Sequence, residues 1–247
     1  MYLTEHKDYS KLKVLIPLSG GINSAAVLCE LADAPIEYDP LELHLFYAHL
    51  REHSKDTPRF VTDLMRFARK RFKNVFCRIT RASVLEYFRR ERFIPHPSKS
   101  PCSDHLKIQP LDRYCNENDI DLDLIGWAKE EFKRRHARAQ KYEPAPALFQ
   151  LYAKKEYPLK EIQNEACFEI VKAKIGWYPK IYDIRDSKGK RVFAHNNCLP
   201  CKNMGAKEFA NVETYYPAKY EAAMDLSDEL KRPWGRSTDN VCRSCEF

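Results

Sequence analysis

Two features are missing from this 247-residue sequence: an apolar run long enough to span a membrane, which takes ~20 residues, and an apolar segment near the N-terminus. The first absence excludes a transmembrane helix. The second excludes a secretory signal peptide, because residues 1–13 are polar and charged. Internal repeats and low-complexity tracts are missing as well. With 44% hydrophobic and 31% charged residues, we expect a globular, cytoplasmic protein without a membrane partner.

The nine cysteines do not indicate a disulfide scaffold, which belongs mostly to small secreted domains. Four of them form two pairs, Cys198-x-x-Cys201 and Cys242-x-x-Cys245. This spacing lets the two thiolates of a pair coordinate the same ion. The pairs predict metal binding, with tetrahedral zinc held by these four residues as one interpretation. Buried free thiols or a redox pair remain the alternative. The others, except Cys102, fall on helix or strand positions and are interpreted as small core residues: Cys29, Cys77, Cys115 and Cys167.

Positive charge is concentrated in one part of the chain. The net charge is +7, and ten Lys or Arg residues lie between Arg66 and Arg92 against only Glu86 and Glu91, with aromatic residues interleaved. Amphipathic helices with solvated basic faces explain this pattern in one interpretation. A surface that faces a nucleotide or a nucleic acid explains it in the other.

Short apolar runs alternate with helical patterns in the first 140 residues. Residues 13–18, 41–50, 74–79 and 121–126 have the composition of buried strands. Helical patterns follow at residues 24–32, from Thr57-Pro58, from Ser83 and at residues 106–116, with a proline-rich loop at 93–103. The alternation predicts an α/β fold: an open parallel sheet with helices on both faces.

The composition changes after Pro144 and Pro146. We therefore predict an α/β domain over residues 1–143 and a helical, cysteine-rich, metal-binding region over residues 144–247. In the second region a helix is expected from Asn164, as its N-cap, to Ile175, where Gly176 stops it.

The turn after the first strand has the composition of an anion site. Residues 19–24 read Ser-Gly-Gly-Ile-Asn-Ser, and a helix pattern follows. Gly20 and Gly21 let backbone N–H groups approach phosphate, while Ser19 and Ser24 add hydroxyl donors. The lysine and the longer spacing of a Walker loop are absent, as is the dinucleotide fingerprint. A strand-to-helix turn that merely favours glycine is the plain alternative.

This turn resembles the PP-loop of N-type ATP pyrophosphatases, Ser-Gly-Gly-x-Asp-Ser, and the whole chain resembles the PAPS reductase family, including its phage and mobile-element members. Further segments match that family in the same order. Residues 48–61, with Glu52 and Thr57-Pro58, come first, followed by the cysteine-to-Pro-Leu segment at 101–111. The family's Gly-Ile-Arg-x-Asp-Glu-Ser-x-x-Arg segment is matched at Gly126, Glu131 and Arg135, and residues 157–176 and the Asn-Cys-x-x-Cys at 197–201 complete the match. The resemblance implies an adenine nucleotide alpha hydrolase-like fold that binds ATP with Mg²⁺.

Three groups of residues depart from the family pattern. Asn23 replaces the usual Asp, and Ile22 stands where Lys is common. His49 occupies the place of the Asp after the second strand. Trp127 and Ala128 replace Ile and Arg. Phosphate binding through backbone donors survives these changes, whereas pyrophosphate release depends more on the lost charges.

The chemistry that the resemblance implies is adenylation, in which an acceptor oxygen attacks the α-phosphate of ATP and pyrophosphate leaves. Nucleotide binding then falls to Ser19, Gly20, Gly21, Asn23, Ser24 and His49, and catalysis to Lys107, Glu131 and Arg135. Lys129 is a further base that can face phosphate. The resemblance also puts Cys102 near Cys198 and Cys201. This favours a [4Fe-4S] iron–sulfur cluster, completed by Cys242 or Cys245, over zinc.

Three functions stay open at this point. The first is an ATP-dependent enzyme that modifies a nucleic acid or a small substrate, with a sulfur-donor protein as a further partner. The second is a PAPS or APS reductase, although the chain ends in Cys242-Arg-Ser-Cys-Glu-Phe247 and not in the Glu-Cys-Gly-Leu-His of that family. The third is a non-catalytic nucleotide- or nucleic-acid-binding module.

Overall fold

A computed structural model describes residues 7–96, 100–133 and 153–234. The chain forms two compact units. The first, here the sheet unit, comprises Met1–Tyr47, Thr57–Ile79 and Leu111–Tyr178; the second, the cysteine unit, comprises Ala48–Asp56, Thr80–Pro110 and Pro179–Phe247. Their segments alternate along the sequence. The boundary predicted at residues 143–144 lies outside the described residues.

Five strands form one sheet in the order β3-β2-β1-β4-β5. Their bounds are β1 Lys13–Pro17, β2 Glu42–Leu50, β3 Val75–Ala82, β4 Leu122–Leu124 and β5 Lys154–Glu156. Strand β1 lies at the centre and pairs in parallel with β2 and β4, and β4 pairs in parallel with β5. The continuous apolar run of β1 fits this central place, because both faces of such a strand are covered.

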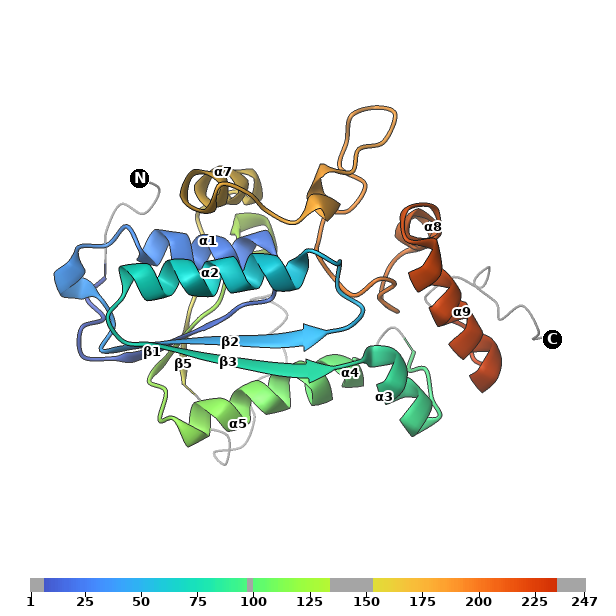
Figure 1. The fold of residues 1–247 in the computed structure, drawn as a ribbon, viewed down its shortest axis with the longest axis horizontal. Coiled ribbons are helices and arrows are strands. Elements are labelled where there is room, and N and C mark those ends of the chain that lie inside the picture. Colours follow the sequence, from blue (N-terminus) through green and yellow to red (C-terminus); the bar gives the residue numbers. More distant parts are fainter. Residues whose placement is uncertain (1–6, 97–99, 134–152, 235–247) are drawn as a thin grey trace. The chain divides into compact units, whose positions relative to one another are not determined.

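Helices cover both faces of the sheet, which confirms the predicted α/β fold (Figure 1). Helices α1, Ile22–Leu31, and α2, Thr57–Arg71, lie on one face, and α5, Gln109–Glu117, lies on the other. Helix α7, Asn164–Ile175, packs against α1 and ends at Gly176 with a left-handed φ of 86°. A short 3-10 turn, η1, Ile36–Tyr38, precedes β2.

The sheet buries one carboxyl group. Asp123 of β4 is 5% exposed and pairs in register with Leu15 and Lys155, and its Oδ1 atom has no hydrogen-bond partner among the residues that the structure describes. Burial raises its pKa to about 7, with Lys155 opposing the effect and Asp112 adding to it.

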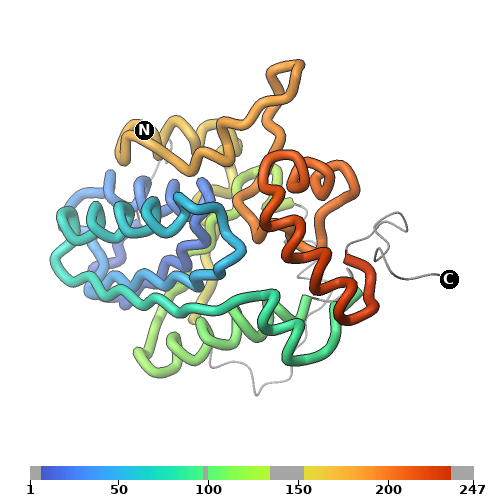
Figure 2. Tube along the Cα trace, turned by 45° about the vertical axis from the view of Figure 1, so that its right-hand side comes forward, coloured from blue at the N-terminus to red at the C-terminus, as the bar shows by residue number. Residues whose placement is uncertain are grey.

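The cysteine unit packs helices around its own apolar core. It contains α3 Val84–Glu91, α4 Pro101–Ser103, the π-helical stretch η2 Asp104–Ile108, the 3-10 turn η4 Lys180–Asp183, α8 Ala206–Tyr215 and α9 Pro217–Leu230. In Figure 2, α8 and α9 follow one another as the red part of the trace. Phe88 and Trp234 are fully buried in this core, with ring centroids 5.8 Å apart.

The structure differs from the predicted elements at three places. Strand β5, Lys-Lys-Glu, was not predicted, because an exposed edge strand of charged residues lacks an apolar run. The helix predicted at 106–116 falls on the end of the π-helical stretch η2 and on α5, and the helical run begins earlier, with α4 at Pro101. Helix α7 has Gln163, not Asn164, as its N-cap. Within the described ranges, every helix is too short or too polar to cross a bilayer.

Candidate functional site: a glycine loop and a group of thiols

The candidate phosphate loop joins β1 to α1. Gly20 has a left-handed φ of 76°, which side chains disfavour, and Gly21 is the N-cap of α1. Because Gly21 has no side chain, the N-cap residue itself makes no side-chain hydrogen bond to this helix, and the first turn carries no acidic residue. The N-terminus of α1 therefore offers its backbone donors and positive dipole end to an anion.

Two serines hold the loop in shape. The Ser19 backbone N–H donates to Ser24 Oγ at 3.1 Å, and the two hydroxyl oxygens lie 3.0 Å apart. The Gly21 N–H donates to Ser19 Oγ at 3.1 Å, and Ser24 Oγ donates to the Gly21 carbonyl at 3.2 Å. These bonds close the turn on itself. The predicted donors Ser19 and Ser24 thus shape the loop in this structure.

The segment after β4 packs directly against the loop. A Cβ atom placed on Gly126 would lie 2.8 Å from the backbone carbon of Asn23 and 2.8 Å from the backbone nitrogen of Ser24. Only glycine fits at this distance. Asn23 Nδ2 donates to Glu131 Oε2 at 3.1 Å, so the structure brings Glu131 to the loop. Arg135 lies outside the described residues.

Three cysteines gather in the cysteine unit. Cys198 is buried in the core of that unit, and Cys102 and Cys201 pack against the same core. Burial raises the pKa of Cys198 to about 12, with Lys107 opposing the effect and Cys201 adding to it. The pKa of Cys102 is raised first by burial and next by Cys201. The thiols are therefore near enough to influence one another electrostatically.

The donor set suits a metal in kind, because thiolates bind both zinc and iron–sulfur clusters. Among the residues that the structure describes, however, no three His, Cys, Asp or Glu side chains are placed so that they hold an ion. Cys242 and Cys245, the remaining predicted ligands, lie outside the described ranges. The choice between zinc and a cluster thus stays a prediction.

Charged side chains of the cysteine unit affect the pKa of these thiols. Lys107 lies in η2, and its charge lowers the pKa of Cys198 and of the buried His53, whose pKa falls to about 3 mainly through burial. His49, the predicted nucleotide ligand, lies in β2. Burial lowers its pKa, and the charge of Arg81 lowers it further. The structure thus places the predicted residues Lys107 and His49 in the cysteine unit.

Sequence reasoning missed the contacts of two lysines. Lys202 follows the second cysteine of the pair directly, yet it is only 2% exposed; its Nζ donates to Asn203 Oδ1 at 2.8 Å and to the His96 carbonyl at 3.2 Å. Lys219 of α9 donates to the carbonyl of His53 at 2.7 Å. The sequence pattern predicted neither lysine contact, because an isolated lysine is normally solvated.

Glu52 has a defined structural partner. Its carboxylate accepts from Ser83 Oγ at 2.6 Å and from the Val84 N–H at 3.0 Å. Ser83 in turn caps α3 by accepting from the Glu86 N–H at 3.2 Å. The family-like segment that contains Glu52 therefore fixes the start of a helix in the cysteine unit.

Two solved structures are similar to this chain. U34-tRNA thiolase NcsA from Methanococcus maripaludis, solved with its [4Fe-4S] iron–sulfur cluster, aligns with a TM-score of 0.47 and 14% identity over 98% of this chain and 82% of its own. PAPS reductase from Candida auris, solved as a phosphate complex, aligns with a TM-score of 0.45 and 15% identity over 69% of this chain and 77% of its own. No family model and no curated protein matches the sequence.

Proposed function

We propose that the chain binds ATP through the Ser19–Ser24 loop and adenylates an acceptor. The observation that carries this proposal is the conformation of the loop: a left-handed glycine, a helix N-terminus with glycine as its N-cap and two serines, at the carboxyl end of the central strand. Open α/β sheets bind ligands at that edge. In the reaction an acceptor oxygen bonds to the α-phosphorus, the bond to the β-phosphate oxygen breaks, and pyrophosphate leaves.

The proposed roles follow the sequence assignment. Ser19, Gly20, Gly21, Asn23, Ser24 and His49 contact the nucleotide with its Mg²⁺. Lys107 and Arg135 stabilise the negative charge that develops on the phosphates, and Glu131 is the third catalytic residue. Under the cluster interpretation Cys102, Cys198 and Cys201 hold the iron, with Cys242 or Cys245 completing the set. Under the zinc interpretation Cys198, Cys201, Cys242 and Cys245 hold the ion. When bound, an iron–sulfur cluster supplies a site for sulfur chemistry, whereas zinc supplies folding energy.

The test of ATP binding is the double variant Gly20→Val/Gly21→Val. Its β-branched side chains occupy the space of the phosphate and strain the left-handed position, so we expect at least a hundredfold weaker ATP binding by calorimetry. Circular dichroism and urea unfolding establish that the variant is folded. A folded double variant with unchanged affinity contradicts the proposal. Pyrophosphate release by the wild-type protein then separates adenylation from binding alone, and sulfite release from PAPS would support the reductase alternative.

A nucleic acid is the acceptor that the surface of the sheet unit favours. Residues 64–85 contain seven Lys or Arg and no acid. Four of these cations are exposed in the sheet unit without an ion pair among the described residues: Arg69, Lys70, Lys73 and Arg78. Such a run attracts a phosphate backbone.

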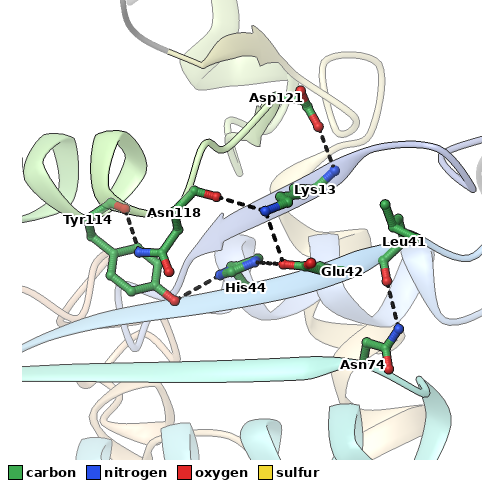
Figure 3. Close-up of polar contacts among 8 residues, drawn as sticks. All are labelled: Lys13, Leu41, Glu42, His44, Asn74, Tyr114, Asn118 and Asp121. Atoms are coloured by element: carbon green, nitrogen blue, oxygen red, sulfur yellow. Dashed lines mark hydrogen bonds and ion pairs between the residues drawn. The ribbon is translucent and has the colours of Figure 1, made fainter.

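An aromatic platform lies beside these cations. Phe76 of the edge strand β3 is 48% exposed, and its ring stacks on His44 at 4.9 Å between centroids. His44 is held from two sides, by Tyr114 Oη at 2.8 Å and Glu42 Oε2 at 3.0 Å (Figure 3). An exposed ring on a fixed support suits base stacking, which contributes about 1–3 kcal/mol per base.

The variants Phe76→Ala and Arg78→Glu test this acceptor. We expect each to weaken the binding of a single-stranded RNA about tenfold, and Arg78→Glu to reduce the salt dependence as well. The matched control is Lys172→Glu on the exposed face of α7, which should leave binding unchanged. Equal loss in Arg78→Glu and Lys172→Glu, with none in Phe76→Ala, would mean that only net charge matters. No RNA binding by the wild type would favour a small acceptor.

A further inference from the structure

The contact between Asn23 and Glu131 joins two segments that follow neighbouring strands. Asn23 lies in the first turn of α1, after β1, and Glu131 lies in a short helical segment, residues 129–133, after β4. Gly126 permits their approach, because any larger residue would collide with the backbone of the loop. The contact is therefore part of how the loop is held.

The chemistry of the two groups fixes the direction of their hydrogen bond. An ionised carboxylate can only accept, so the amide nitrogen of Asn23 must face Glu131. The amide oxygen then points away, where it is buried and has no hydrogen-bond partner among the described residues. An aspartate at position 23 would put two carboxylates at hydrogen-bond distance, and like charges this close disfavour each other strongly.

Two departures from the family pattern, at Asn23 and Ala128, leave the net charge of this region unchanged. That pattern has Asp, Arg and Glu at the positions of Asn23, Ala128 and Glu131. Here one acid and one base are lost together, and the net charge of the three positions stays at −1. Ala128 is completely buried, so no cation at position 128 offsets a second carboxylate at position 23.

We infer that Asn23 and Glu131 form a matched pair that positions the loop for phosphate, so that Asn23 is an adaptation of the loop and not a sign of lost activity. Glu131 supplies the carboxylate, and the Asn23 amide holds it against the loop. This inference rests on the proposed binding of ATP. One consequence is counterintuitive: Asn23→Asp, which restores the family sequence, should harm this chain.

Exchanging the two groups tests the pair. We expect Asn23→Asp to weaken ATP binding at least tenfold through repulsion. Glu131→Gln keeps an acceptor for the Asn23 amide and should cost only a few-fold. The double variant Asn23→Asp/Glu131→Gln restores a carboxylate–amide bond with its direction reversed, so its affinity should return to within about threefold of the wild type. If the two side chains act independently of one another, the losses of the single variants add and no such rescue follows.

Two results would overturn the pair. One is an Asn23→Asp variant that binds ATP as well as the wild type or better. The other is a double variant as weak as Asn23→Asp alone. Urea unfolding of the same four proteins gives a second cycle without ATP. If the wild type does not bind ATP, the proposed function fails, and this second cycle still decides on the pair: recovery of stability in the double variant supports it, and additive loss refutes it.

Discussion

The glycine loop and the group of thiols differ in how the chain builds them. The loop consists of six consecutive residues, closed by hydrogen bonds among its own backbone and serines. The thiols come from α4 and from a segment almost a hundred residues later, and they share only an apolar core. A site of the first kind depends on local conformation. A site of the second kind exists only when distant segments fold together, so its presence reports on the folding of the chain more directly.

The largest expected effect is the loss of metal. If Cys102 is a cluster ligand, Cys102→Ser should remove colour and iron from protein purified without oxygen, measured by absorption and elemental analysis. Under the zinc interpretation the same variant keeps one zinc per chain, whereas Cys242→Ser releases it. The control is Cys115→Ser, a buried cysteine of the sheet unit, which should leave the metal content unchanged. Metal-free wild-type protein with all these thiols open to titration would refute both interpretations.

The buried carboxyl group of the sheet should make stability depend on pH. Since the pKa of Asp123 is raised to about 7 in the folded state, its favourable contribution is complete below its ordinary pKa and is lost as pH rises to about 7. The free energy of unfolding of the wild type should fall by about 4 kcal/mol more than that of Asp123→Asn between pH 4 and pH 7.5. Urea titrations at both values measure this difference. Parallel pH profiles would show that Asp123 is ionised and solvated in the folded protein.

The variant Gly126→Ala should affect the glycine loop and leave the group of thiols unchanged. The Cβ of Gly126→Ala meets backbone atoms of the loop at 2.8 Å, so the loop must shift, and we expect about a hundredfold weaker ATP binding with an unfolding free energy lower by about 1–3 kcal/mol. Metal content should not change. Gly205→Ala is the matched control, because nothing lies within 4 Å of its added Cβ. If both variants bind ATP equally, the close approach of Gly126 does not shape the loop.

The smallest expected effect is at the start of α3. Ser83→Ala removes the N-cap acceptor and one donor to Glu52, so unfolding should become easier by about 1–2 kcal/mol, while ATP binding stays the same. Ser83→Thr keeps the hydroxyl group and should recover most of this loss. A fall in ATP affinity for Ser83→Ala would show that the glycine loop depends on the cysteine unit more than we expect.

The two regions also show what the sequence could predict. The strands of residues 13–18 and 41–50, the glycine turn and the start of a helix at Ser83 were predictable, because each depends on a few neighbouring residues. Strand β5 was not, because its pairing with β4 and not its own composition makes it a strand. The contact of Asn23 with Glu131 and the burial of Lys202 were likewise hidden. Both depend on segments that lie far apart in the sequence or that fold over one another.

The alternation of the two units along the chain constrains how the protein can be divided. Neither unit is a continuous stretch, since each takes three segments. A fragment ending at residue 143 would contain residues 48–56 and 80–110 without residues 179–247, which complete their core. Single-cut truncation should therefore yield insoluble fragments, and recombination that joins chains end to end cannot exchange one unit alone.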